Sequence, residues 1–143
     1  MTVIVPVPIE RLRRTALRLG ISIYWYPTVT GKHFPHAAYC ETVSGPIIFL
    51  NPVIAESPKS YRCALAYALG CHQAGSGDEL LVLRRSYDLV LPDRWLIARL
   101  SWHPSRIAEE ADVLQEWVEA KLNLISSESR HRAAFSSEGE AST

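Results

Sequence analysis

Apolar side chains follow a helical repeat near the start of the chain and a strand-like pattern after it. The repeat within residues 9–20 consists of Ile9, Leu12, Ala16 and Leu19. Gly20 follows it and can end a helix. β-branched and aromatic types then fill residues 21–27, which predicts a strand. Residues 28–38 are rich in turn-forming types and predict a surface loop.

Two further apolar stretches predict a β-hairpin. Residues 37–43 and 46–51 are separated by Ser44 and Gly45, which is a short turn of the kind that joins antiparallel strands. The second stretch is continuously apolar from Pro46 onward, so we expect it to form the central strand of the sheet.

Helix signals dominate from Ser57 onward. Ser57 and Pro58 supply a hydroxyl cap followed by proline at the first helical position, and Gly75 and Gly77 end this helix. Residues 80–91 favour a second helix, with a strand and turn as the alternative.

Prolines divide the remaining chain. Pro92 begins a short helix, Pro104 opens another, and a turn near Asp112 divides that last apolar-periodic stretch into two helices. Residues 126–143 are rich in Ser and Glu and poor in apolar types, which predicts a disordered tail after a single domain over residues 1–125.

Composition removes several classes of protein. The 15 basic and 15 acidic residues balance, which is not the basic footprint of a nucleic-acid-binding protein. No apolar run reaches the roughly 20 residues that cross a bilayer, so no membrane partner is expected. Three cysteines without paired spacing indicate free thiols, and hence a cytoplasmic protein.

The helix that follows Pro58 carries the most distinctive motif. Its stretch LAYALGCH resembles the L-A-H-E-L-G-H of the ImmA/IrrE family of metallopeptidase-like domains, in a register fixed by Leu65, Ala66, Leu69 and Gly70. In such a helix two histidines four residues apart bind zinc, and the glutamate acts as general base. The register places Tyr67 at the first histidine, Ala68 at the glutamate and Cys71 at the second histidine.

The order of elements supports the same resemblance. Arg62 lies where the family often has an arginine, and residues 93–95 resemble its A-D-R-W segment with Pro92 in place of the alanine. Residues 106–109, with Val113, Val118 and Leu122, resemble the end of the family pattern. The resemblance implies an α+β fold, with a small antiparallel or mixed sheet packed on a zincin-like motif helix and additional helices at the C-terminus.

The departures from the family motif remove its chemistry. Both histidines and the general base are replaced, and the third ligand is an acid for which Asp88 stands about one position out of register. Without a general base, the rate of hydrolysis by metal-bound water falls by a factor of about 10²–10⁴. We therefore expect no catalytic residue, metal or cofactor, and a former active-site cleft lined by Tyr67, Ala68, Cys71, His72 and Asp88.

The leading functional hypothesis is a non-catalytic protein-binding module. In active relatives the domain cleaves a helix-turn-helix repressor, so the resemblance implies a phage or mobile-element regulator of transcription that binds a repressor without cutting it. The candidate partner-binding residues are a basic helix face and one tryptophan, Arg11, Arg14, Arg18 and Trp95, with an ordinary solvated face as the alternative. The partner is a repressor-like protein or a second copy of the chain.

Two alternatives stay open. The first is a metal-dependent peptidase with a non-standard ligand set drawn from Cys71, His72, Asp88 and either His33 or His36. His33 and His36 also form an H-x-x-H-x-x-x-C pattern with Cys40, for which a solvated loop is the simpler interpretation. The second alternative is a structural or assembly protein of a phage-like element.

Overall fold

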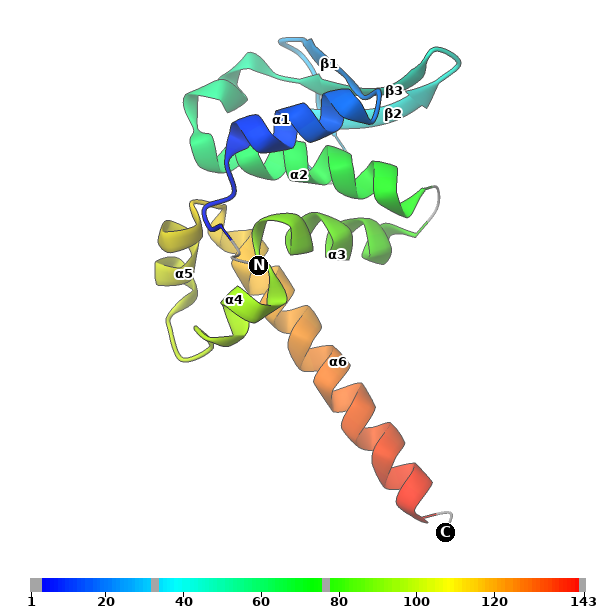
Figure 1. Cartoon of the computed structure of the whole chain (residues 1–143), viewed down its shortest axis with the longest axis vertical. Helices are drawn as coiled ribbons and strands as arrows, with labels where there is room; N and C mark the ends of the chain where they lie inside the picture. Colours follow the sequence, from blue (N-terminus) through cyan, green and yellow to red (C-terminus); the bar gives the residue numbers. More distant parts are fainter. Residues whose placement is uncertain (1–3, 32–33, 76–77, 142–143) are drawn as a thin grey trace.

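A small sheet and several helices are stacked in layers in the computed structural model (Figure 1). The structure describes the backbone of residues 4–31, 34–75 and 78–141, and side chains as far as residue 130. The sheet lies over α2 (Pro58–Ala74), α1 (Ile9–Arg18) packs alongside α2, and α3 (Glu79–Val90) lies on the side of α2 away from the sheet. The predicted α+β class is therefore confirmed.

The sheet is mixed and has three strands. The parallel pair is β1 (Ser22–Trp25) with β3 (Gly45–Leu50), and the antiparallel pair is β2 (Ala37–Thr42) with β3. The order β1-β3-β2 confirms the predicted hairpin and the central place of its second strand. Gly45 has φ 120°, a conformation that a residue with a Cβ rarely adopts, and this explains the glycine in the turn.

The two faces of the sheet differ in exposure. Because side chains alternate along a strand, Ile48 and Leu50 of β3 point to the same face, and both are fully buried. Ala37 pairs with Leu50 and is buried with it. The opposite face carries Phe49 beside the exposed ring of Tyr24, with centroids 6.0 Å apart. The hydrophobic core therefore lies between the inner face and the helices.

Helix α2 is buried along most of its length. The hydroxyl of Ser57 accepts a hydrogen bond from the N–H of Ser60, Pro58 follows, and Gly75 ends the helix with φ 72°, as predicted. All ten residues from Arg62 to Cys71 are buried. A Cβ on Gly70 would lie 2.1 Å from Oγ of Ser86, so only glycine permits this close approach of α2 and α3.

The later helices also match the sequence prediction. Residues 80–90 fall within α3 and Leu91 caps its end, while Pro92 precedes α4 (Asp93–Ile97) and Pro104 opens α5 (Pro104–Ala111). At the predicted turn, Asp112 has a left-handed backbone conformation with φ 53°, and α6 (Gln115–Ala141) follows it. A short 3₁₀ helix, η1 (Pro52–Glu56), joins β3 to α2.

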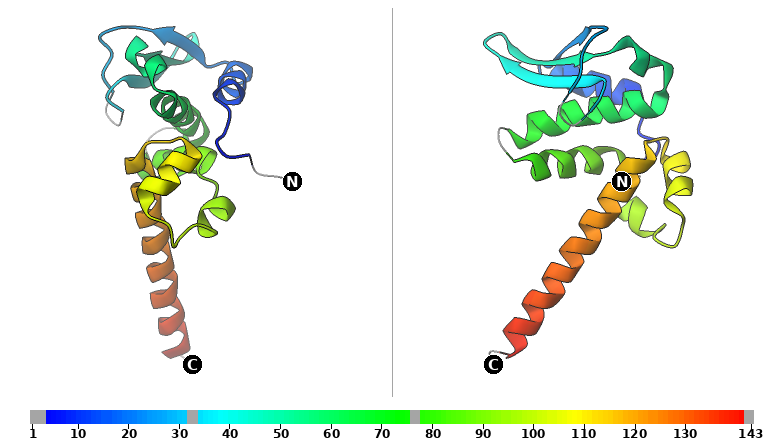
Figure 2. Two further views of the ribbon diagram at one scale, coloured as in Figure 1. Left: turned by 90° about the vertical axis from the view of Figure 1, so that its left-hand side faces the viewer. Right: turned by 180° about the vertical axis from the view of Figure 1, so that it is seen from behind.

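Helix α6 leaves the body of the molecule (Figure 2). Its backbone is helical as far as Ala141, whereas the sequence predicts disorder from residue 126. A helix without packing partners is only marginally stable in water. The disordered tail over residues 126–143 and the domain boundary at residue 125 therefore stay predictions.

Arg62 connects three parts of the chain inside the core. Its Nε donates to the carbonyl of Val7 at 2.6 Å, and its Nη1 donates to the carbonyl and to Oδ2 of Asp112 at 2.6 and 2.8 Å. The guanidinium thereby ties α2 to the segment before α1 and to the turn between α5 and α6. The arginine that the family resemblance singled out has a structural role here.

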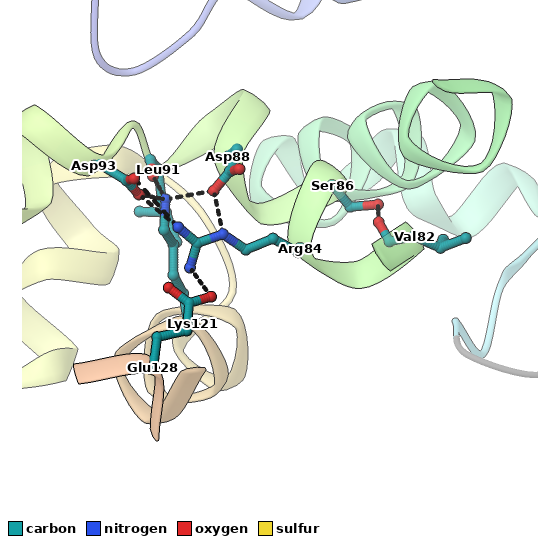
Figure 3. A network of polar contacts seen from close by, with 8 residues as sticks. All are labelled: Val82, Arg84, Ser86, Asp88, Leu91, Asp93, Lys121 and Glu128. Atoms are coloured by element: carbon teal, nitrogen blue, oxygen red, sulfur yellow. Dashed lines mark hydrogen bonds and ion pairs between the residues drawn. The ribbon is translucent and has the colours of Figure 1, made fainter. Parts of the chain in front are cut away.

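A second charged group ties α6 to α3 and α4 (Figure 3). Lys121 is fully buried, and its Nζ contacts Oδ1 of Asp88 at 2.8 Å, Oδ1 of Asp93 at 2.7 Å and the carbonyl oxygen of Leu91. Arg84 contacts the same two aspartates at 3.3 and 3.2 Å, and its Nη1 lies 3.2 Å from Oε1 of Glu128 on α6. These contacts offset the desolvation of the ammonium group.

Replacing Arg62 is expected to destabilise the fold strongly. Arg62→Met keeps much of the volume but leaves the carbonyls of Val7 and Asp112 and the carboxylate of Asp112 without their donor, so we expect a loss of about 3 kcal/mol in the free energy of unfolding. Urea unfolding followed by tryptophan fluorescence measures it. The control, Arg14→Met on the exposed face of α1, should change stability by less than about 0.5 kcal/mol. Equal effects of the two substitutions would contradict the role of Arg62.

Asp93 makes the stability of the fold depend on pH. The hydrogen bond to Lys121, together with the charges of Lys121 and Arg84, lowers the pKa of its carboxyl against the opposing effect of burial. A carboxyl with a lowered pKa stabilises the fold above its unfolded pKa of about 3.9, and that contribution is lost as pH falls through the folded pKa. The stability difference between wild type and Asp93→Asn should thus be constant near neutral pH and shrink below about pH 4. Urea unfolding across that range tests this, and a difference that does not change with pH would contradict it.

Candidate functional site

The three motif positions of α2 hold buried, uncharged side chains. Tyr67 and Cys71 are four residues apart, so they project from one side of the helix, and they are 8% and 7% exposed. Ala68 is fully buried. A methyl group at the position of the general base cannot accept a proton from water.

Burial also suppresses the acidity of this pair. It raises the pKa of the Cys71 thiol, and a hydrogen bond with Tyr67 opposes that rise only in part. Burial is likewise the largest cause of the raised pKa of Tyr67, and the bond to Cys71 raises it further. At neutral pH the pair is therefore a neutral phenol and a neutral thiol. Neither is the anionic form that zinc or a general-base mechanism would need.

Aromatic rings fill the space beside Tyr67. Phe34, from the loop before β2, lies with its ring centroid 6.4 Å from Tyr67 and 6.2 Å from Trp117 of α6. Tyr87 of α3 packs edge-on against Trp117 with centroids 5.0 Å apart. No local sequence pattern links these rings, because they come from four separate segments of the chain.

His72 faces the sheet. Its Nδ1 lies 3.4 Å from the hydroxyl of Tyr39 on β2, and that hydroxyl donates to Oε1 of Glu41 at 3.2 Å. Burial, and next the bond to Glu41, raise the pKa of Tyr39. The histidine that the sequence assigned to the cleft thus connects α2 to strand β2.

Asp88 belongs to a different part of the molecule. Its carboxylate contacts Lys121 and Arg84, on the side of α3 that faces α4 and α6 (Figure 3). The sequence assigns five residues to the former cleft. Tyr67 and Cys71 contact each other and Ala68 is buried. His72 and Asp88 have other partners, so the structure does not bring the five together.

The non-standard metal set gains no geometric support. Among the residues that the structure describes, no three His, Cys, Asp or Glu side chains are grouped so that they could hold an ion. His33 lies outside the described residues, while His36 and Cys40 are exposed near and on β2. The metal site that includes His33 stays a prediction.

The backbone of β2 presents one open edge. Residues of an antiparallel pair direct their N–H and C=O groups alternately toward the partner strand and away from it. The N–H of Asn51 donates to the carbonyl of His36 at 2.8 Å. The even-numbered residues of β2 therefore direct their backbone N–H and C=O groups toward β3. The backbone groups of Tyr39 and Glu41 consequently point outward. In the described part of the chain they make no backbone hydrogen bond on that side.

The loop before β2 limits this edge. The N–H of Gly31 donates to the carbonyl of Phe34, and a Cβ on Gly31 would lie only 1.7 Å from the carbonyl oxygen of Ala37. The loop therefore covers the start of the strand, and the close approach requires glycine. The open edge is therefore the backbone at Tyr39 and Glu41, which points away from β3.

The candidate partner-binding residues have two different surroundings. Arg11, Arg14 and Arg18 line an exposed depression of about 490 Å³ on α1, together with Pro8 and Glu10. Trp95 is half-buried, and the guanidinium of Arg99 lies over its ring, 4.2 Å from the centroid. The arginines are available to a partner, whereas Trp95 is engaged within the chain.

None of the helices in the described ranges is long and apolar enough to cross a membrane.

The three cysteines should differ sharply in reactivity, because the thiolate is the nucleophile. Cys40 is exposed, the pKa of Cys71 is raised, and burial raises the pKa of Cys63 to about 12. With iodoacetamide at pH 8 we expect Cys40 to be alkylated more than about tenfold faster than Cys71, with Cys63 slowest. Peptide mass spectrometry over time measures the three rates. Labelling of Cys71 as fast as Cys40 would show a reactive site beside Tyr67.

Comparison with known proteins adds no relative. No family model matches the chain, and no curated protein or solved structure is significantly similar to it. The resemblance to the ImmA/IrrE family therefore rests on the residues quoted from the sequence.

Proposed function

We propose that this chain is a non-catalytic protein-binding module that takes up an extended segment of a partner along the open edge of β2. The observation that carries the proposal is the outward backbone of Tyr39 and Glu41. An exposed strand edge presents unpaired N–H and C=O groups, and an extended segment can pair with them as an additional strand.

The side chains around this edge favour binding over hydrolysis. The motif positions supply no general base, because Ala68 carries only a methyl group. They supply no ionised metal ligand either, because burial raises the pKa of Tyr67 and Cys71. The aromatic rings of Phe34 and, beyond it, Trp117 pack beside Tyr67, so apolar groups surround the motif position. A bound segment would therefore be held without activation of water beside it.

The resemblance to ImmA/IrrE domains suggests the class of partner. Such domains act on repressors of phages and mobile elements, so a repressor-like regulator in the cytoplasm is the natural candidate. A chain that holds the repressor without cutting it would control it stoichiometrically, one bound chain for each repressor.

Removal of one outward N–H tests the strand edge. Binders are selected from a library of random peptides on the immobilised protein, and their affinities are measured by fluorescence anisotropy. Glu41→Pro removes the outward N–H without disturbing the pairing with β3, and should weaken binding about tenfold or more. Glu41→Thr removes the same carboxylate but keeps the N–H, so it should bind within about threefold of wild type.

Three results would contradict the proposed function. The selection could yield no binder, or Glu41→Pro and Glu41→Thr could bind equally well. Zinc-dependent hydrolysis of the selected peptides that is lost in Cys71→Ser would instead support the alternative of a peptidase with a non-standard ligand set.

A further inference from the structure

A small pocket opens between the loop before β2 and the start of α6. Its volume is about 210 Å³, and its lining residues are Phe34, Pro35, Tyr87, Leu114, Glu116 and Trp117. Phe34, Tyr87 and Trp117 are at most 7% exposed and form the floor, whereas Pro35 and Glu116 are exposed at the rim. Sites for drug-sized ligands span about 300–1,000 Å³, so this pocket has the size for a single side chain.

Two polar groups in this pocket have no partner among the described residues. The ring of Tyr87 is 6% exposed, and its hydroxyl makes no hydrogen bond to another described side chain or carbonyl. Glu116 forms no ion pair within the described part, although the neighbouring Glu119 accepts a hydrogen bond from Gln115. The hydroxyl oxygen of Tyr87 is not among the fully enclosed unpartnered atoms of the described residues, so it opens into the pocket and is available to a ligand.

The two groups together define the chemistry of a ligand. A carboxylate accepts hydrogen bonds only, and a phenol oxygen can accept one as well. Tyr87 and Glu116 line the same pocket; burial is the main cause of the raised pKa of Tyr87, and the negative charge of Glu116 adds to the rise. The complementary ligand is a hydrogen-bond donor with a positive charge.

We propose that this pocket binds one lysine or arginine side chain of the partner segment. The apolar stem of such a side chain packs against Pro35, Leu114 and the edges of the buried rings, and its charged end reaches Glu116 and the hydroxyl of Tyr87. Phe34 and Pro35 lie two to three residues before β2 begins at Ala37, so the pocket lies near the start of the strand along which the segment is proposed to pair. The inference deepens the proposed function, because it names a residue type that the partner must carry.

Glu116 has an alternative, purely local role. It lies in the first turn of α6, where an acidic side chain stabilises the positive end of the helix dipole. That role needs no ligand, and a Gln at the same position would change stability without changing any affinity. The experiment must therefore measure binding as well as stability.

Single-residue probes test the pocket in the intact chain without any strand addition. The probes are Nα-acetyl-lysine amide, Nα-acetyl-arginine amide and Nα-acetyl-norleucine amide, which has a similar stem and no charge. NMR titration follows the indole N–H signal of Trp117. We expect saturable binding of at least one cationic probe, at least about tenfold tighter than that of the norleucine probe, and weaker at high salt because the interaction is ionic.

Matched variants locate the binding. Glu116→Gln should weaken the cationic probe about tenfold, whereas Glu119→Gln, one turn along the same helix, should leave it unchanged. Tyr87→Phe keeps the ring and should weaken it about threefold. Equal binding of the norleucine probe, an unchanged affinity in Glu116→Gln, or no saturable shift with either cation would overturn the proposal.

The two proposals fail separately. The probes have too little backbone to form a strand, so their titration does not depend on the edge of β2. Loss of peptide binding in Glu41→Pro with intact probe binding supports both proposals. Probe binding without any effect of Glu41→Pro on peptides overturns the proposed strand addition alone, and the reverse result overturns the pocket alone.

Discussion

Helix α2 is buried over ten consecutive residues, and the remaining elements are placed by the need to cover it. The sheet covers one side, α1 lies alongside, and α3 approaches so closely that a glycine is required at position 70. A helix covered on all sides cannot show an amphipathic pattern. Its sequence is therefore a run of small and apolar residues with one arginine, Arg62, whose Nε and Nη1 donate to backbone carbonyls and Asp112.

The same burial determines the chemistry of the motif positions. A zinc-binding helix of the metallopeptidase type needs a face open to substrate, with ligands that can ionise there. Here the corresponding face meets Phe34 and, through it, Trp117. Tyr67 and Cys71 bond to each other and remain neutral. The packing that stabilises the helix is thus the reason that its motif positions lack an ionised ligand or a base, and the proposed binding sites are the neighbouring strand edge and pocket.

Charged residues complete the core where apolar ones do not reach. Lys121 is wholly buried and is compensated by Asp88, Asp93 and the carbonyl of Leu91 (Figure 3). Because this network recruits Asp88, the acid is directed toward α6 and away from α2. The network joins α6 to α3 and α4, and desolvation of the buried ammonium group offsets much of the attraction.

Sequence patterns by themselves determined most of the elements of this protein, but not η1 or the helical backbone of α6 beyond residue 125. The capped start of α2, the hairpin turn, the proline-led helices and the left-handed turn at Asp112 all follow from local backbone chemistry, which a short stretch of residues encodes completely. They also determined that the motif positions lack a base. Tertiary structure alone decided which rings meet at Trp117, which partner Asp88 takes and which backbone groups of β2 stay open. These depend on contacts between separate segments of the chain, and no local pattern records which distant side chain or strand fills a given space.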